Sequence, residues 1–162
     1  MMLIVVWNVE HFVFVDECGL TDDCRRNRAR AKRGVRVHGV KPGKRRPQRT
    51  NVVAGLLNGK HVAVRCYNHT TTSVFFEDWF EWELIPAIPE GSVVILDNAS
   101  FHRKSQLALI AEKYGVGLLF LPAYSPDFNK IEFSWANLKR WLTDNICRFF
   151  SLDFAIEQYF EI

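Results

Sequence analysis

Three acidic residues stand where regular structure is predicted to hold side chains in place. Asp16 ends the apolar run HFVFVD (11–16), Asp97 ends the run SVVILD (92–97), and Glu132 lies at the start of a helical pattern. If the two strands are neighbours at the centre of a sheet, the aspartates lie side by side and the helix brings the glutamate to them. Carboxylates this close repel one another, and oxygen ligands of this kind are what Mg²⁺ accepts. We therefore expect a divalent-metal site.

The chemistry that such a site supports is displacement at phosphorus. Two divalent ions about 3.5–4 Å apart stabilise both the attacking and the leaving oxygen of an in-line displacement. Acids suit the role better than amides because neutral ligands hold Mg²⁺ too weakly. Strand ends suit it because the separation of the metals sets the geometry. The pattern predicts Mg²⁺ or Mn²⁺ as the cofactor, with two ions bound.

Each acid also has a simpler interpretation. Asp16 could be a turn residue at the end of its strand, and Asp97 with Asn98 could form an Asx turn. Asn129 can cap the helix that follows it, and Glu132, three residues later, can reach back in a capping-box arrangement. The metal-site hypothesis depends on the assumed order of the strands.

The basic residues are concentrated in one part of the sequence. Between Cys24 and Phe76 there are 14 Lys and Arg residues and no Asp or Glu, whereas the rest of the chain carries 7 basic and 18 acidic residues. A solvated surface normally intersperses both signs, so a one-sign segment predicts a polyanionic partner. Nucleic acid is the favoured partner. A flexible basic loop that only aids solubility is the alternative.

Length and composition are those of an ordinary globular domain. The 162 residues, 48% hydrophobic and 24% charged, predict a single domain over 1–162 with a real core. No apolar run reaches the roughly 18 residues needed to span a bilayer, and the opening MMLIVVW lacks the features of a signal peptide. Four cysteines without paired close spacing predict cytosolic thiols rather than a zinc site or disulfides.

The first half of the chain predicts one strand followed by a hairpin. The run 11–16 alternates around Val and Phe, as is typical of a strand, and residues 17–49 form a long polar connection. The β-rich runs TNVVAGLL (50–57) and HVAVRCY (61–67) are separated by Asn-Gly-Lys. Because Asn-Gly between such runs favours a hairpin, we expect these three strands to pair antiparallel.

The second half predicts alternating helices and strands. Pro86 and Pro89 are expected to end the first of these helices. Two continuous apolar runs with a helix between them are typical of a parallel crossover whose strands are covered on both faces. The predicted elements are helix 74–85, strand 92–97, helix 106–115, strand 117–122, a long helix with the apolar stripe Ile131, Trp135, Leu138 and Leu142, and a further helix within 150–160. The order predicts an α/β fold with a five-stranded mixed sheet, three antiparallel then two parallel strands, flanked by helices.

Three segments resemble the catalytic blocks of a known family. VFVDECG, VVILDNASFH and LPAYSPDFNKIEFSWANLK are similar to the blocks of DDE transposases of the mariner superfamily, in its bacterial insertion-sequence branch. Thirty-four residues separate Asp97 from Glu132, which is the spacing of members whose third acid is Glu. The resemblance implies a ribonuclease H-like fold and an endonuclease that cleaves DNA strands at element ends and joins them to target DNA.

Carried over to this chain, the resemblance implies roles for particular residues. Asp16, Asp97 and Glu132 would be the metal ligands that activate water, and later a DNA 3′-hydroxyl, for attack on phosphate. His102 could equally be a structural histidine. Lys130 stands where the family usually has Pro, a residue suited to the first turn of a helix. The candidates for supporting the ligands or contacting DNA are Glu17, Asn98, His102, Arg45, Arg46, Arg49 and Lys130.

The resemblance also implies partners and leaves alternatives open. Full-length relatives carry helix-turn-helix domains that recognise terminal repeats, and only ten residues precede the first predicted strand. We expect that region to be absent, with DNA recognition supplied by a separate or frameshift-fused polypeptide. Duplex DNA, a homodimer, no membrane, and a cytoplasmic or nucleoid-associated location are the further expectations. The alternatives are a catalytically silent DNA-binding remnant of a decayed element and a general nuclease of the same fold.

Overall fold

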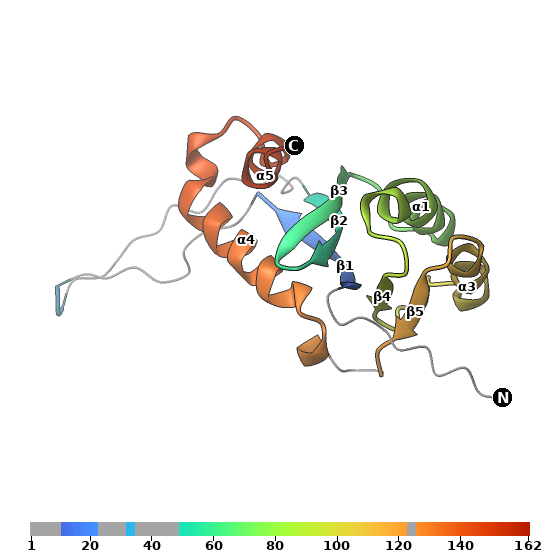
Figure 1. The fold of residues 1–162 in the computed structure, drawn as a ribbon. Coiled ribbons are helices and arrows are strands. Elements are labelled where there is room, and N and C mark those ends of the chain that lie inside the picture. Colours follow the sequence, from blue (N-terminus) through green and yellow to red (C-terminus); the bar gives the residue numbers. More distant parts are fainter. Residues whose placement is uncertain (1–10, 23–31, 35–48, 123–125) are drawn as a thin grey trace.

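A five-stranded mixed sheet organises the computed structural model of this protein (Figure 1). The structure describes residues 11–22, 32–34, 49–122 and 126–162, so the candidates Arg45 and Arg46 and the loop residues 123–125 lie outside it. The strands are β1 (Phe12–Thr21), β2 (Arg49–Leu57), β3 (Lys60–Tyr67), β4 (Val93–Leu96) and β5 (Gly117–Phe120), in the order β3-β2-β1-β4-β5. The predicted five-stranded sheet is confirmed, and the first and fourth strands pair at its centre, as the metal-site hypothesis assumed.

The first three strands pair antiparallel, as predicted. The turn between β2 and β3 consists of Asn58 and Gly59, with φ of 50° and 78°. Two residues with positive φ form the hairpin turn whose twist matches that of the flanking strands, and Asn-Gly is the pair that adopts it most readily. The hairpin is therefore specified locally by its turn.

The last two strands are parallel to β1, also as predicted. The four residues of β4 are all buried, as expected for a strand covered on both faces. The prediction that the last strand is equally buried is wrong, because β5 lies at the edge of the sheet and Leu119 is 50% exposed. Helix α3 (Lys104–Lys113) connects these two strands.

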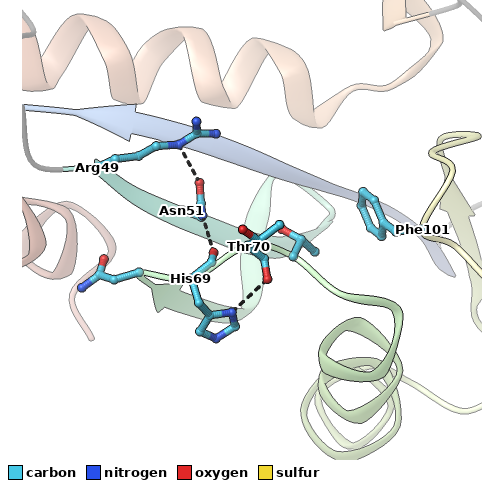
Figure 2. Close-up of a pocket in the computed structure, with 7 residues that line it drawn as sticks. Arg49, Asn51, His69, Thr70 and Phe101 are labelled. Atoms are coloured by element: carbon cyan, nitrogen blue, oxygen red, sulfur yellow. Dashed lines mark hydrogen bonds between the residues drawn. The ribbon is translucent and has the colours of Figure 1, made fainter.

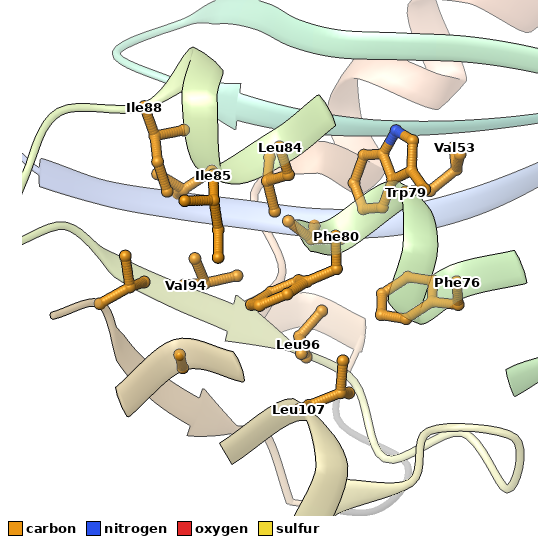
Figure 3. Close-up of a cluster of buried hydrophobic side chains, with 14 of the residues drawn as sticks. Val53, Phe76, Trp79, Phe80, Leu84, Ile85, Ile88, Val94, Leu96 and Leu107 are labelled. Carbon is orange, nitrogen blue, oxygen red and sulfur yellow. The ribbon is translucent and has the colours of Figure 1, made fainter. Parts of the chain in front are cut away.

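The helices pack on both faces of the sheet (Figure 1). Val13 and Val15 of β1 face one core, which contains the buried aromatics of the first helical segment and Leu107 of α3 (Figure 3). Cys18 and Leu20 of β1 face the other core. The remaining helices are α1 (Ser73–Trp79), α2 (Ile85–Ala87), α4 (Ile131–Asn145) and α5 (Leu152–Phe160), with a π-helical segment Phe80–Leu84 and short 3₁₀ turns at Pro126–Phe128 and Ile146–Arg148.

Several predicted boundaries differ from the structure, and two of the differences have a clear physical cause. The first strand does not end at Asp16 but continues to Thr21, because β2 extends the antiparallel ladder as far as the pair Thr21 and Arg49. Of the two prolines expected to end the first helix, Pro86 does not, since the helix continues to Ala87 and ends before Pro89. In a regular α-helix the proline ring would clash with the carbonyl four residues earlier. Here the wider π-helical segment Phe80–Leu84 precedes the proline and accommodates it.

The last two helices agree with the sequence. The predicted stripe on α4 is fully buried, and it packs against the even-numbered residues of β1 and against α5. In the described part of the chain Cys18, Cys66 and Cys147 are free thiols. None of the helices described by the structure is long and apolar enough to cross a membrane.

Candidate active site

Asp16 lies in β1 on the face covered by α4. Trp135 of α4 donates an indole hydrogen bond of 3.0 Å to Asp16 Oδ2. Burial, followed by the charges of Glu17 and Glu132, raises the pKa of the Asp16 carboxyl to about 7. The structure therefore brings Asp16 and Glu132, 116 positions apart in the sequence, within electrostatic reach of each other.

Glu132 occupies the first turn of α4 and is exposed. The capping arrangement given as the simpler alternative is wrong, since the helix begins after Lys130 and has no side-chain cap. The side chain of Asn129 turns instead toward the sheet, where Nδ2 donates a 3.1 Å hydrogen bond to the carbonyl O of Val15. A tertiary contact has replaced the local one.

Asp97 follows the last residue of β4. The parallel ladder pairs Phe14 with Ile95, so continuing the same register by two residues places Asp97 beside Asp16. The carboxylate Oδ1 accepts a 3.1 Å hydrogen bond from the backbone N–H of Ala99, which is the Asx turn foreseen as the simpler alternative. The same oxygen lies 3.3 Å from Nδ1 of His102.

His102 joins two acids. The imidazole is almost fully buried, and its Nε2 lies 3.4 Å from Glu17 Oε1. Burial opposes the charged form, but hydrogen bonds to Asp97 and Glu17 outweigh it and raise the pKa of His102 to about 9. The ring packs 4.3 Å from that of Phe76 and 4.4 Å from that of Phe101. His102 is thus protonated at neutral pH and holds Asp97 from the core side of the sheet.

The carboxylates of Asp16, Asp97 and Glu132 are the kind of ligand that a hard divalent cation binds. In this structure, however, the three side chains do not converge on one point. Burial, followed by the charges of Glu17 and Glu132, raises the pKa of the Asp16 carboxyl, and a cation would relieve the repulsion between these carboxylates. Among the residues that the structure describes, no three His, Cys, Asp or Glu side chains form a metal-holding group. The carboxylate of Asp97 would have to turn from His102 toward Asp16 to complete the set.

A cavity of about 490 Å³ lies where Arg49 begins β2 (Figure 2). Arg49 Nε donates a 3.3 Å hydrogen bond to Asn51 Oδ1, and Asn51 Nδ2 donates one of 2.8 Å to the carbonyl of His69. A Cβ on Gly19 would lie 2.8 Å from Arg49 Nη2, so glycine there leaves room for the guanidinium. The lining residues are Arg49, Asn51, Asn68, His69, Thr70, Thr71 and Phe101.

The remaining predicted residues are dispersed, and some contacts had no sequence signal. Asn98 is exposed, and the Lys130 ammonium lies 5.4 Å from the ring centroid of Phe14. Sequence reasoning missed the bond from Trp135 to Asp16 and the cavity around Arg49, because each joins segments distant in sequence. Trp135 lies four residues after Ile131 on the apolar stripe, and this spacing predicted that Trp135 is buried but not that it forms a hydrogen bond.

The strand order, with helices on both faces of the mixed sheet, is that of a ribonuclease H-like fold. A profile of the DDE superfamily endonuclease family matches residues 11–151. The chain belongs to this family, as the sequence resemblance predicted. No curated protein matches the sequence at a significant level.

Solved structures share the fold at low sequence identity. A pre-cleavage Mos1 transpososome aligns with a TM-score of 0.75 and 16% identity, over 94% of this chain and 47% of that chain. The catalytic domain of Mos1 mariner transposase aligns with a TM-score of 0.61 and 14% identity, over 94% of this chain and 68% of that one. The catalytic core domain of BIV integrase aligns with a TM-score of 0.53 and 12% identity, over 91% of this chain and 79% of that chain. The chain thus spans about half the length of the transposase in the Mos1 complex.

Proposed function

We propose that this chain is the catalytic domain of a transposase, which cleaves DNA strands at transposon ends and joins them to target DNA with Mg²⁺ or Mn²⁺. The observation that carries the proposal is the acidic site itself, where Asp16 and Glu132 act on one another and Asp97 directly follows the adjacent strand. The Mos1 complexes solved with Mn and with Mg support divalent ions as the cofactor. Two ions would suit the three acids.

In this proposal Asp16, Asp97 and Glu132 would hold the ions. Divalent ions, when bound, stabilise the attacking and leaving oxygens of an in-line displacement at phosphorus. The nucleophiles would be water for cleavage and a DNA 3′-hydroxyl for joining. The chain's own residues supply position and charge. Helix α4 keeps Glu132 near Asp16, and the hydrogen bonds of His102 lower the pKa of Asp97, so that this ligand is ionised.

DNA would lie across the part of the surface that holds both the acids and the Arg49 cavity. Phe101 lines the Arg49 cavity, and its neighbour His102 contacts Asp97, so a strand with its phosphate at the acids would pass close to the cavity. Arg45, Arg46 and Arg49 and the rest of the basic segment would neutralise phosphates. Asn98 and Lys130, both exposed, would contact the backbone nearer the acids. A homodimer and a separate helix-turn-helix polypeptide would complete the assembly.

Nicking of supercoiled plasmid tests the function. The wild-type chain is expected to convert supercoiled plasmid to the open-circular form with Mn²⁺ or Mg²⁺ and to stop when EDTA is added. Asp97→Asn should reduce the rate to that seen without metal, because an amide binds the cation far more weakly than a carboxylate. Equal nicking by the wild type and Asp97→Asn would contradict the assignment.

A second candidate function is a DNA-binding remnant without catalysis. The observation that favours it is the orientation of the Asp97 carboxylate, which is bonded to His102 and Ala99 rather than gathered with the other acids. The plasmid assay separates the two functions, since a remnant would bind DNA but would not nick it at any concentration of metal. A general nuclease would nick plasmids with and without transposon ends equally.

Arg49→Ala is expected to weaken DNA binding and to reduce its salt dependence. Each phosphate contact contributes about 0.9 to the slope of log K against log salt, so losing one should lower that slope by about 1. Binding of a labelled duplex is measured by fluorescence anisotropy at several salt concentrations. Arg65→Ala is the matched control, because Arg65 belongs to the same basic segment but forms an ion pair with Glu83. An unchanged slope in Arg49→Ala would exclude Arg49 from the DNA contact.

A further inference from the structure

Asn129 is a buried polar residue that joins the helix carrying Glu132 to the strand carrying Asp16. It lies just before α4 and is only 3% exposed. Its Nδ2 donates a 3.1 Å hydrogen bond to the carbonyl O of Val15, the residue before Asp16. The backbone carbonyl O of Asn129 accepts a 3.1 Å hydrogen bond from the backbone N–H of Glu132. One residue therefore contacts the main chain beside both candidate ligands.

We propose that Asn129 is a positioning residue whose amide fixes the first turn of α4 against β1, and so sets the place of Glu132 relative to Asp16. The proposal rests on the proposed function, since it gives the positioning a purpose in metal binding. Asn129 acts only through Glu132 and touches no reacting group.

The carboxylate of Glu132 depends on the helix for its place. In the part of the chain that the structure describes, this carboxylate has no hydrogen-bond partner and is exposed. Segment 129–135 is held at both ends, by Asn129 to Val15 at one end and by the Trp135 indole to Asp16 Oδ2 at the other. Glu132 lies between these two attachments. Releasing the first would leave the helix start free to move away from β1.

The unpaired oxygen of Asn129 argues against a purely packing role. Its Oδ1 is buried and has no hydrogen-bond partner among the described residues. An unpaired buried acceptor costs free energy, and an apolar side chain of the same branched shape, such as leucine, would avoid that cost. Asparagine at this position is therefore explained by its donor, because the bond from Nδ2 to Val15 is what leucine would lose.

The test compares two equivalent substitutions in α4 and its flanks. Asn129→Leu removes the bond to Val15, and Asn145→Leu removes a 2.9 Å bond from Asn145 Nδ2 to the carbonyl of Trp141 at the far end of the helix. Mn²⁺ affinity is measured by electron paramagnetic resonance without DNA. We expect Asn129→Leu to bind Mn²⁺ about 10- to 100-fold more weakly, as is usual when a group supporting a ligand is lost. Asn145→Leu should bind like the wild type.

Kinetics give a readout that general destabilisation would not produce. In Asn129→Leu, raising the Mn²⁺ concentration should restore part of the nicking rate. The plasmid concentration that gives half the maximal rate should stay unchanged, because no DNA-contacting side chain is altered. If Asn129→Leu does not fold, Asn129→Ala, which adds no bulk, is compared in the same way.

A metal-free measurement distinguishes failure of this inference from failure of the proposed function. With ¹⁵N-labelled tryptophan, the indole N–H resonance of Trp135 reports how α4 sits on Asp16. Asn129→Leu should shift this resonance and speed its exchange with solvent, and Asn145→Leu should not. If the wild type binds no Mn²⁺ and nicks no DNA, the proposed function fails, and the resonance alone decides on Asn129. An unmoved resonance, or wild-type Mn²⁺ affinity in a folded Asn129→Leu, overturns the inference.

Discussion

Asp16→Asn is expected to abolish metal-dependent nicking and at the same time to stabilise the metal-free protein at pH 8. Activity should fall by about 10³-fold or more, because the substitution removes a charged metal ligand that has no substitute nearby. Stability should rise because the native Asp16 carboxylate is ionised at pH 8 in a half-buried place beside Glu17 and Glu132. The asparagine keeps an oxygen for the Trp135 indole but carries no charge.

The sign follows from the two pKa values of Asp16. In the folded protein the pKa is about 7, against an ordinary value of 3.8. Between about pH 4 and pH 7 the native carboxyl holds a proton that the unfolded chain has lost, so wild-type stability falls as pH rises through that window. Above it the full cost applies, about 4 kcal/mol at most. Asp16→Asn should remove this fall, as measured by urea unfolding in EDTA from pH 4 to pH 8.

Asp97→Asn is the matched control for the stability effect, because the pKa of Asp97 is shifted the other way. The hydrogen bond from His102 lowers it, so ionised Asp97 stabilises the fold above its unfolded pKa and loses that contribution in acid. The amide should therefore lower stability at pH 8, whereas Asp16→Asn raises it. Lower stability in both variants at pH 8 would contradict the electrostatic account of Asp16.

Trp135→Ala is expected to destabilise the protein by about 3–5 kcal/mol. Trp135 is 1% exposed and packs with the rings of His61 and Phe160 between α4 and the sheet. Removing the indole leaves a cavity and frees Asp16 from its hydrogen bond. Since domains of this kind are stable by about 5–15 kcal/mol in total, much of the folding free energy would be lost, as measured by urea unfolding.

Two further variants separate the causes of that loss. Trp135→Phe keeps an aromatic ring but removes the N–H donor, so it should cost less than Trp135→Ala and still raise the pKa of Asp16 further. Trp82→Ala removes an indole that is 67% exposed and should change stability by no more than about 0.5 kcal/mol. Equal losses in Trp82→Ala and Trp135→Ala would show that burial is not the cause.

The elements that the sequence predicted correctly are those with a local physical cause. Asn58 and Gly59 specify the hairpin through their backbone preferences, and the buried stripe of α4 follows from helical spacing alone. The continuous apolar run of β4 predicted a strand covered on both faces, and all four residues are buried. In each case neighbours in sequence carry the whole signal.

The errors occurred where the adjoining segment, as at Pro86, or a distant segment, as at Asn129 and Asp16, changed a local preference. Pro86 was expected to end a helix, but the preceding π-helical segment accommodates it. Asn129 was a candidate cap of α4 in the simpler interpretation, but its amide donates a hydrogen bond to a carbonyl on β1 instead. Asp16 was expected to end a strand that in fact continues, because β2 supplies pairing partners as far as Thr21.

By itself the sequence determined the family, the five strands and the positions of the three acids near strand ends and at a helix start, since ordered motifs and hydrophobic periodicity are properties of the chain, whereas the order of the strands was assumed. Only the tertiary structure decided how those acids are held. Asp16 gains a pKa of about 7 from burial beside Glu17 and Glu132, and Asp97 is drawn to the imidazolium of His102. Burial and charge proximity arise from residues far apart in sequence, so they exist only once the sheet has formed.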